Sequence, residues 1–119
     1  MPKADQVRVL CVDDQDSMLK LHRYAFAQLG VRKVDVATTA VVAADLILSN
    51  EYDLVTLDWN MPGTDGLTLF KALRKNPKTA KLPIIMVTGN AEESSVKTAI
   101  AAGVRLFLRK PVAVRDLKV

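Results

Sequence analysis

The sequence has few of the residues that build covalent or stacking frameworks. Its single cysteine, Cys11, excludes an intrachain disulfide and a cysteine metal cluster. Aromatic residues make up only 5% of the chain, too few for a platform that stacks single-stranded nucleic acid. No apolar run approaches the roughly 20 residues that span a bilayer, and the first residues lack the apolar centre of a signal peptide. We therefore expect a cytoplasmic protein with no membrane segment.

Composition and charge are those of an ordinary globular domain. Half of the 119 residues are hydrophobic and 25% are charged, so the whole chain, residues 1–119, is expected to form one domain. The net charge of +4 comes from scattered Lys and Arg residues, which makes direct binding of nucleic acid an unfavoured function.

One stretch, residues 54–63, organises the rest of the chain. The apolar run Leu54–Leu57 predicts a buried strand, and it ends abruptly at Asp58. Turn residues follow at once, beginning with Asn60. In an open α/β sheet, ligands bind outside the carboxyl ends of the strands, which is where Asp58 would lie. Taken alone, Asp58 is more simply explained as a residue that caps a loop through its side chain.

Apolar runs and helical periodicity alternate along the chain. The alternation predicts βαβ units and a parallel sheet, an α/β fold. The expected strands cover residues 7–12, 34–37, 54–57, 83–87 and 106–108. The expected helices begin at Asp16, after Thr38 or Thr39, and at Asp65, and cover 92–102 and 113–119, with Gly30 closing the first.

Helical spacing also predicts which side chains face the sheet. His22 is expected on the surface or edge of the first helix, because a single histidine without a partner motif makes a poor metal site. The inward residues are expected to be Met18, Leu21, Ala25 and Leu29 in the first helix, Val42, Ala43, Leu46 and Ile47 in the second, and Leu67, Phe70 and Leu73 in the third.

Polar residues follow four of the predicted strands: Asp13 and Asp14, Asp58, Thr88 and Lys110. In a parallel sheet they share one edge. Three crowded carboxylates repel one another, and Mg²⁺, which prefers oxygen ligands, resolves that conflict. With a lysine and a hydroxyl nearby, the set suits phosphoryl transfer onto a carboxylate. Asp13 and Asp14 could otherwise cap the first helix.

Several motifs in order match a known family. They are Val12-Asp13-Asp14, Leu57-Asp58-Trp59-Asn60-Met61-Pro62 with Asp65-Gly66, Met86-Val87-Thr88, and Lys110-Pro111. With them, the chain resembles the response-regulator receiver domain of two-component systems, in particular the single-domain chemotaxis regulators. The resemblance implies a flavodoxin-like doubly wound (βα)5 sandwich whose five-stranded parallel sheet has the order 2-1-3-4-5.

The resemblance also implies a role for each matching residue. Asp58 would be the phosphoacceptor and Lys110 would pair with it. Mg²⁺ would be held by Asp14 directly, by Asp13 mainly through water, by Asp58 and by the backbone carbonyl of Asn60. Thr88 would move toward the phosphoryl group and Phe107 would follow it as an aromatic switch.

By the same resemblance, the chain would be a phosphoacceptor that assists its own phosphotransfer and autodephosphorylation, without being an enzyme in the usual sense. Its partners would be a sensor histidine kinase and an output protein or domain, possibly in chemotaxis, that binds the face of the fourth helix and fifth strand. No direct contact with nucleic acid or membrane is expected.

The sequence departs from the family pattern at its end. About seven residues, 113–119, remain for a fifth helix, which suggests a shortened helix or a fragment of a longer regulator. Apolar surface left uncovered there could support a homodimer. A phosphorylation-independent interaction module on the same fold is the main alternative. An FMN-binding domain is disfavoured by acidic residues after the first strand, and an aspartyl phosphatase by the lack of a further acidic metal site late in the chain.

Overall fold

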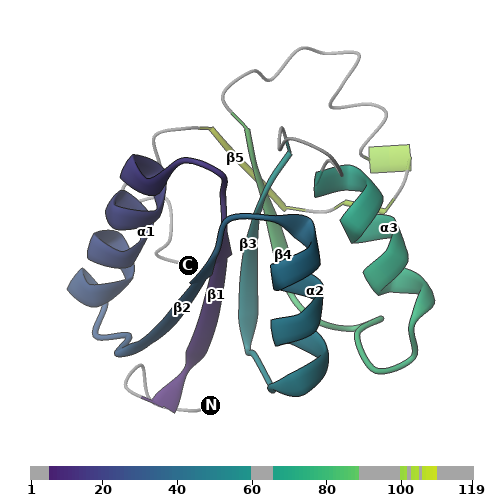
Figure 1. Cartoon of the computed structure of the whole chain (residues 1–119), viewed down its shortest axis with the longest axis horizontal. Helices are drawn as coiled ribbons and strands as arrows, with labels where there is room; N and C mark the ends of the chain where they lie inside the picture. The colour runs from purple at the N-terminus through teal and green to yellow at the C-terminus, as the bar shows by residue number, and fades with distance from the viewer. Residues whose placement is uncertain (1–5, 60–65, 89–99, 102, 105, 110–119) are drawn as a thin grey trace.

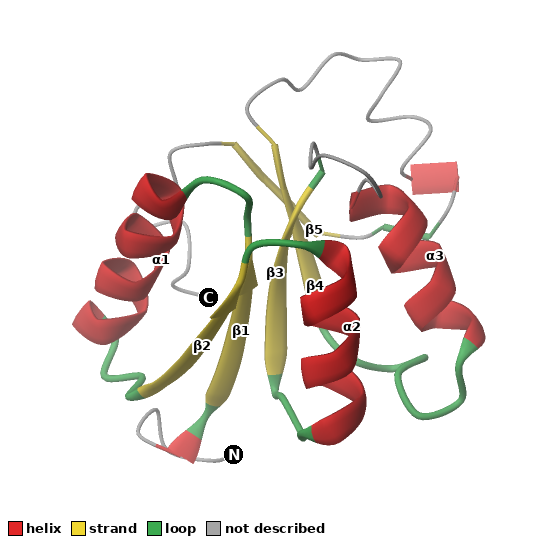
Figure 2. Ribbon diagram, viewed as in Figure 1, coloured by secondary structure: helices red, strands yellow, loops and turns green. Residues whose placement is uncertain are grey.

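The chain forms a five-stranded parallel sheet in the order β2-β1-β3-β4-β5 (Figures 1 and 2). The computed structural model describes residues 6–59, 66–88, 100–101, 103–104 and 106–109. The expected strand order is thereby confirmed. The strands are β1 (Arg8–Val12), β2 (Lys33–Ala37), β3 (Leu54–Asp58), β4 (Ile84–Thr88) and β5 (Leu106–Arg109).

Helices cover both faces of the sheet. α1 (Asp16–Gln28) lies on one face, and α2 (Ala40–Ser49) and α3 (Gly66–Lys75) lie on the other (Figure 1). Of the expected fourth helix only residues 100 and 101 are both described and helical. The expected fifth helix, 113–119, lies outside the described residues. Within the described part of the chain, no helix is long and apolar enough to cross a membrane.

Alternation along the strands divides the core into two layers. In β1, Val9 and Cys11 pack with Leu19 and Phe26 of α1. Leu10 and Val12 point the other way, into the larger cluster beneath α2 and α3. Because side chains alternate between faces with a period of two, a fully apolar run such as β1 is suited to a strand buried on both faces.

The inward face of α1 differs from the one that we expected. Its buried residues are Leu19, His22, Ala25 and Phe26, so of the expected stripe only Ala25 is buried. Leu21 is 42% exposed, and His22, expected near the surface, is 1% exposed. α1 carries apolar side chains on more than one face, so more than one face could pack on the sheet. The face that does so places the large Phe26 beside Val9 and Cys11, and it also buries His22.

The inward faces of α2 and α3 follow the expectation more closely. In α2, Ala43 and Ile47 are buried as expected, whereas Val42 is 45% exposed and Ala40 takes its place inside. All three expected residues of α3, Leu67, Phe70 and Leu73, are buried.

Local signals at the ends of the first two helices act as expected. Gly30 follows the C-cap residue Leu29 and has φ of 87°, a conformation that glycine adopts without strain. Thr39 is the N-cap of α2, and its Oγ1 accepts a hydrogen bond from the Val42 N–H at 3.2 Å. The structure thus selects Thr39 over Thr38.

We predict that Thr39→Ala lowers the free energy of unfolding by about 1 kcal/mol, because it leaves a helix N–H without its side-chain acceptor. Urea denaturation followed by circular dichroism measures the change. Thr38→Ala, at the exposed neighbouring position, is the matched control and should change stability much less. Equal losses in the two variants would contradict the assignment of the cap.

Candidate functional site

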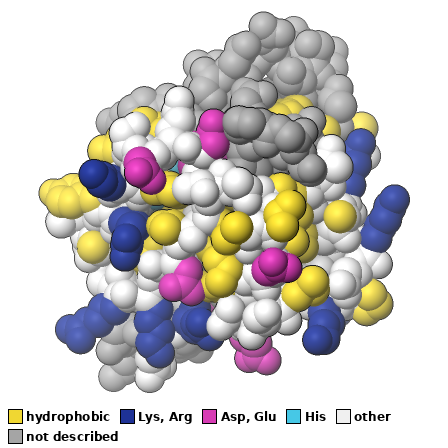
Figure 3. Space-filling model, viewed as in Figure 1, with side chains coloured by type: hydrophobic (Ala, Val, Ile, Leu, Met, Phe, Trp, Pro, Cys, Tyr) yellow, Lys and Arg dark blue, Asp and Glu magenta, His cyan; other side chains and the backbone are white. Residues whose placement is uncertain are grey.

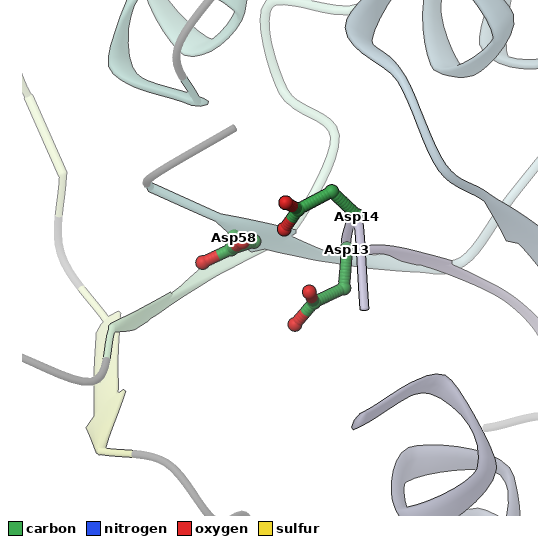
Figure 4. Close-up of side chains that lie close together, drawn as sticks. All are labelled: Asp13, Asp14 and Asp58. Carbon is green, nitrogen blue, oxygen red and sulfur yellow. The ribbon is translucent and has the colours of Figure 1, made fainter. Parts of the chain in front are cut away.

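Three carboxylates meet at the carboxyl ends of two adjacent strands. Asp13 and Asp14 directly follow β1, and Asp58 is the last residue of β3. β1 and β3 pair in parallel with Val12 opposite Leu57, which puts Asp13 beside Asp58. One carboxylate oxygen from each residue lies within 4.8 Å of the others, and all three side chains are directed toward the same side (Figure 4).

Backbone hydrogen bonds hold Asp13 in place. Its N–H donates to the Ala37 carbonyl at 3.0 Å, which extends the pairing of β1 with β2 by one residue. Its Oδ1 accepts from the Gln15 N–H at 2.9 Å, a local turn that leads the chain into α1. The N-cap residue of α1 is Gln15, without a side-chain hydrogen bond. The helix-cap alternative for Asp13 and Asp14 therefore does not account for the pair.

Asp58 is held by the strand on its other side. The N–H of the next residue, Trp59, donates to the Val87 carbonyl of β4 at 3.1 Å. The Trp59 carbonyl accepts from the Gly66 N–H at 2.8 Å, so α3 begins against the end of β3. These contacts fix the backbone of Asp58 and therefore the position of its carboxylate.

The donor set fits a hard divalent cation. Asp13 and Asp58 are 0% and 1% exposed, whereas Asp14 is exposed at the rim. Burying two carboxylates this close to a third is unfavourable unless positive charge is nearby. Mg²⁺ takes oxygen ligands, commonly binds one or two carboxylates and retains several waters. A site of two buried carboxylates that is open toward solvent at Asp14 suits those requirements.

A second layer of buried polar side chains lies beneath the carboxylates. Cys11 and Thr56 are opposite each other on β1 and β3, two residues before Asp13 and Asp58, and therefore on the same face of the sheet. Burial raises the pKa of the Cys11 thiol to about 11, although the Thr56 hydroxyl and the Arg23 charge oppose the increase. Cys11 is therefore a neutral thiol at physiological pH and packs as a small buried side chain.

Thr56, which is 2% exposed, is not among the site residues predicted from the sequence. The two-residue periodicity of β3 could have identified it, because it puts Thr56 on the same face as Asp58. His22 is likewise buried on the face of α1 that covers this side of the sheet. The layer next to α1 thus contains the buried polar groups of Cys11, Thr56 and His22.

The remaining predicted site residues are placed only in part. Thr88 ends β4, one residue beyond the Val87 that pairs with Asp58, and therefore lies at the same edge of the sheet. Phe107 lies in β5 opposite Met86. Asn60 and Lys110 lie outside the described residues. A hollow of about 790 Å³, whose lining includes Arg8, Tyr52 and Lys78, lies away from the carboxylates.

The response regulator receiver domain family matches residues 9–119, nearly the whole chain. The chain belongs to the response-regulator receiver family. Chemotaxis protein CheY of Pseudomonas aeruginosa is 31% identical over 112 residues, which cover 94% of this chain and 90% of the relative. Chemotaxis protein CheY-3 of Vibrio cholerae is 30% identical over 112 residues, or 94% and 86% of the two chains.

A solved structure supports the same assignment. That of Vibrio cholerae chemotaxis protein CheY4 has a TM-score of 0.85 and 26% identity, covering 93% of this receiver and 92% of that chain. The parallel sheet and its strand order thus belong to a flavodoxin-like receiver fold. Receiver domains generally bind Mg²⁺ at an acidic pocket, and in this receiver Asp13, Asp14 and Asp58 form an acidic cluster.

We predict that Gly66→Ala disturbs the acidic pocket of the receiver. A Cβ at this position would collide with the Asp58 carbonyl oxygen and lie 2.9 Å from the carbonyl carbon, so the backbone of Asp58 must shift. Overpacking of this kind costs about 1–3 kcal/mol. The free energy of unfolding should fall by about that amount, and the response of Trp59 fluorescence to Mg²⁺ should weaken.

Gly103→Ala is the control for this experiment. An added Cβ there has space, 3.9 Å from Phe70, but a φ of 104° strains any other residue. This variant should lose stability through its backbone and still respond normally to Mg²⁺. A normal Mg²⁺ response in Gly66→Ala would contradict the prediction.

Proposed function

We propose that Asp58 accepts a phosphoryl group from a histidine kinase in a reaction that requires Mg²⁺. The observation that carries the proposal is the cluster of Asp13, Asp14 and Asp58 at the ends of β1 and β3. An Asp58 oxygen attacks phosphorus while the phosphorus–nitrogen bond of the kinase phosphohistidine breaks. The product is an aspartyl phosphate, and the histidine recovers a proton.

Each carboxylate has a distinct part in this proposal. Asp14, at the exposed rim, would bind the metal directly, and the buried Asp13 would hold it mainly through water. Asp58 and the Asn60 backbone carbonyl would complete the protein ligands. The cation would supply charge neutralisation for the transferring phosphoryl oxygens. Lys110 would pair with Asp58 and then with its phosphoryl group, so that the receiver would assist its own phosphotransfer and autodephosphorylation.

The output of the proposed reaction is a change in the β4–β5 side of the domain. A phosphoryl group adds a charge of about −1.5 to −2 with strong acceptor oxygens. Thr88 stands at the edge of the sheet where its hydroxyl would donate to such an oxygen, and Phe107 of the adjacent strand would move with it. A cytoplasmic output protein or domain, in chemotaxis as for the CheY relatives, would read the altered face of the fourth helix and β5.

We predict that acetyl phosphate with Mg²⁺ adds one phosphoryl group to the wild-type protein and none to Asp58→Asn, because the amide is a poor nucleophile. Intact-protein mass spectrometry measures the addition. Glu51→Gln, the same chemical change at an exposed position outside the pocket, should be modified like the wild type.

The same samples test whether the modification requires Mg²⁺. EDTA should abolish the modification. Mg²⁺ should change the fluorescence of Trp59 in the wild type, and the affinity for Mg²⁺ measured in this way should be at least about tenfold lower in Asp14→Asn. Labelling of Asp58→Asn at the wild-type rate would refute the proposal. An absence of labelling with any phosphodonor would favour the alternative of a phosphorylation-independent interaction module.

We predict that Thr88→Ala is still phosphorylated but does not transmit the change, because it lacks the hydroxyl that would donate to the phosphoryl oxygen. Nuclear magnetic resonance of the β5 amides, before and after addition of beryllofluoride, measures the transmission. Thr38→Ala, an exposed threonine, should shift like the wild type. A complete shift of the β5 amides in Thr88→Ala would exclude this coupling.

A further inference from the structure

The outward face of α2 is apolar, which is unusual for a helix that covers a sheet. Val41 is 70% exposed, Val42 45% and Leu48 49%. Asp45 is the only charged residue among the ten of this helix, and it lies on the same exposed stripe, four residues after Val41 and three before Leu48. Figure 3 shows hydrophobic side chains gathered over α2 around an acidic group.

The other described helices carry several exposed charged residues. α1 exposes Lys20 and Arg23, and α3 exposes Lys71 and Lys75. A helix that covers a core on one side normally carries charged residues on the other, and one that is apolar all round is normally covered on all sides. α2 is buried by this domain on one side only, through Ala40, Ala43 and Ile47. Its other side therefore has the composition of an interface.

The charge on the stripe restricts what can cover it. Packing α2 against α2 of another copy would bring two Asp45 carboxylates together in a partly dehydrated contact, which is unfavourable. The suitable surface combines exposed apolar groups with a cation. The outward face of α1 has that combination, because Tyr24 is 63% and Leu21 42% exposed and both lie close in sequence to the exposed Lys20 and Arg23.

We propose that the outward face of α2 binds the outward face of α1 of a second copy of this chain, with Asp45 facing Lys20. With the two helices antiparallel, Val41 then contacts Tyr24, and Leu21 and Leu48 add apolar area on either side of the charge pair. Lys20 and Tyr24 are one helical turn apart, as are Val41 and Asp45, so the two stripes present matched spacings. The association does not require phosphorylation of Asp58.

The contact joins two different surfaces, so it is heterologous. α1 and α2 lie on opposite faces of the sheet (Figure 1). Each copy therefore offers one face of each kind, and association continues from copy to copy or closes into a ring. Burial of exposed apolar side chains supplies the attraction, and the charge pair selects the partner surface.

Charge reversal tests the proposal in the full chain. Asp45→Lys and Lys20→Glu should each weaken self-association at least about tenfold, because like charges would then face each other. The double variant, with both charges exchanged, should restore association to within a few-fold of the wild type. Sedimentation velocity across the micromolar range measures the equilibrium, and circular dichroism confirms that every variant is folded.

Lys71→Glu, on the exposed face of α3, makes the same charge change outside the contact and should leave association unchanged. A monomeric wild type at the highest concentration would overturn the proposal. Association that Asp45→Lys leaves intact would also overturn it, since another surface would be responsible. Failure of the double variant to recover would overturn the assignment of α1 as the partner face.

Discussion

The pairing of β1 with β3 is the constraint on which the site depends. Both strands are parallel, adjacent and nearly equal in length, so they end at the same level, with Val12 opposite Leu57. The first polar residue after β1 and the last residue of β3 then have to be neighbours. A shift of one residue in either strand would turn one carboxylate to the opposite face of the sheet and separate the pair.

The carboxylates are held in fixed positions by the sheet. Two of them are almost completely removed from water, and an exposed third one stands next to them. The backbone around them is fixed through the Ala37 carbonyl for Asp13 and the Val87 carbonyl after Asp58. The sheet therefore presents these oxygen donors as a preformed set, and the strands would not have to rearrange to hold a hard cation.

The two faces of the sheet have different characters. The layer beneath α2 and α3 contains the larger hydrophobic cluster of the described residues and provides most of the buried core. The layer beneath α1 contains Cys11, Thr56 and His22, all nearly inaccessible to solvent. Asp13 and Asp58 belong to this second, more polar side. The chemical pocket and the principal hydrophobic core are thus separated by the alternation of side chains along the same strands.

The sequence by itself determined the strands, the three carboxylates and the cap at Gly30, since these depend on apolar runs and turn residues, and it narrowed the N-cap of α2 to Thr38 or Thr39. The strand order came from the resemblance to a family, not from any pattern in the strands. Only the tertiary structure decided which face of α1 is buried and that Val42 is exposed. Apolar residues occur around both helices, so more than one rotation fits their periodicity. The choice between rotations depends on how side chains such as Phe26 fit the opposing strand, which is information that no single segment contains.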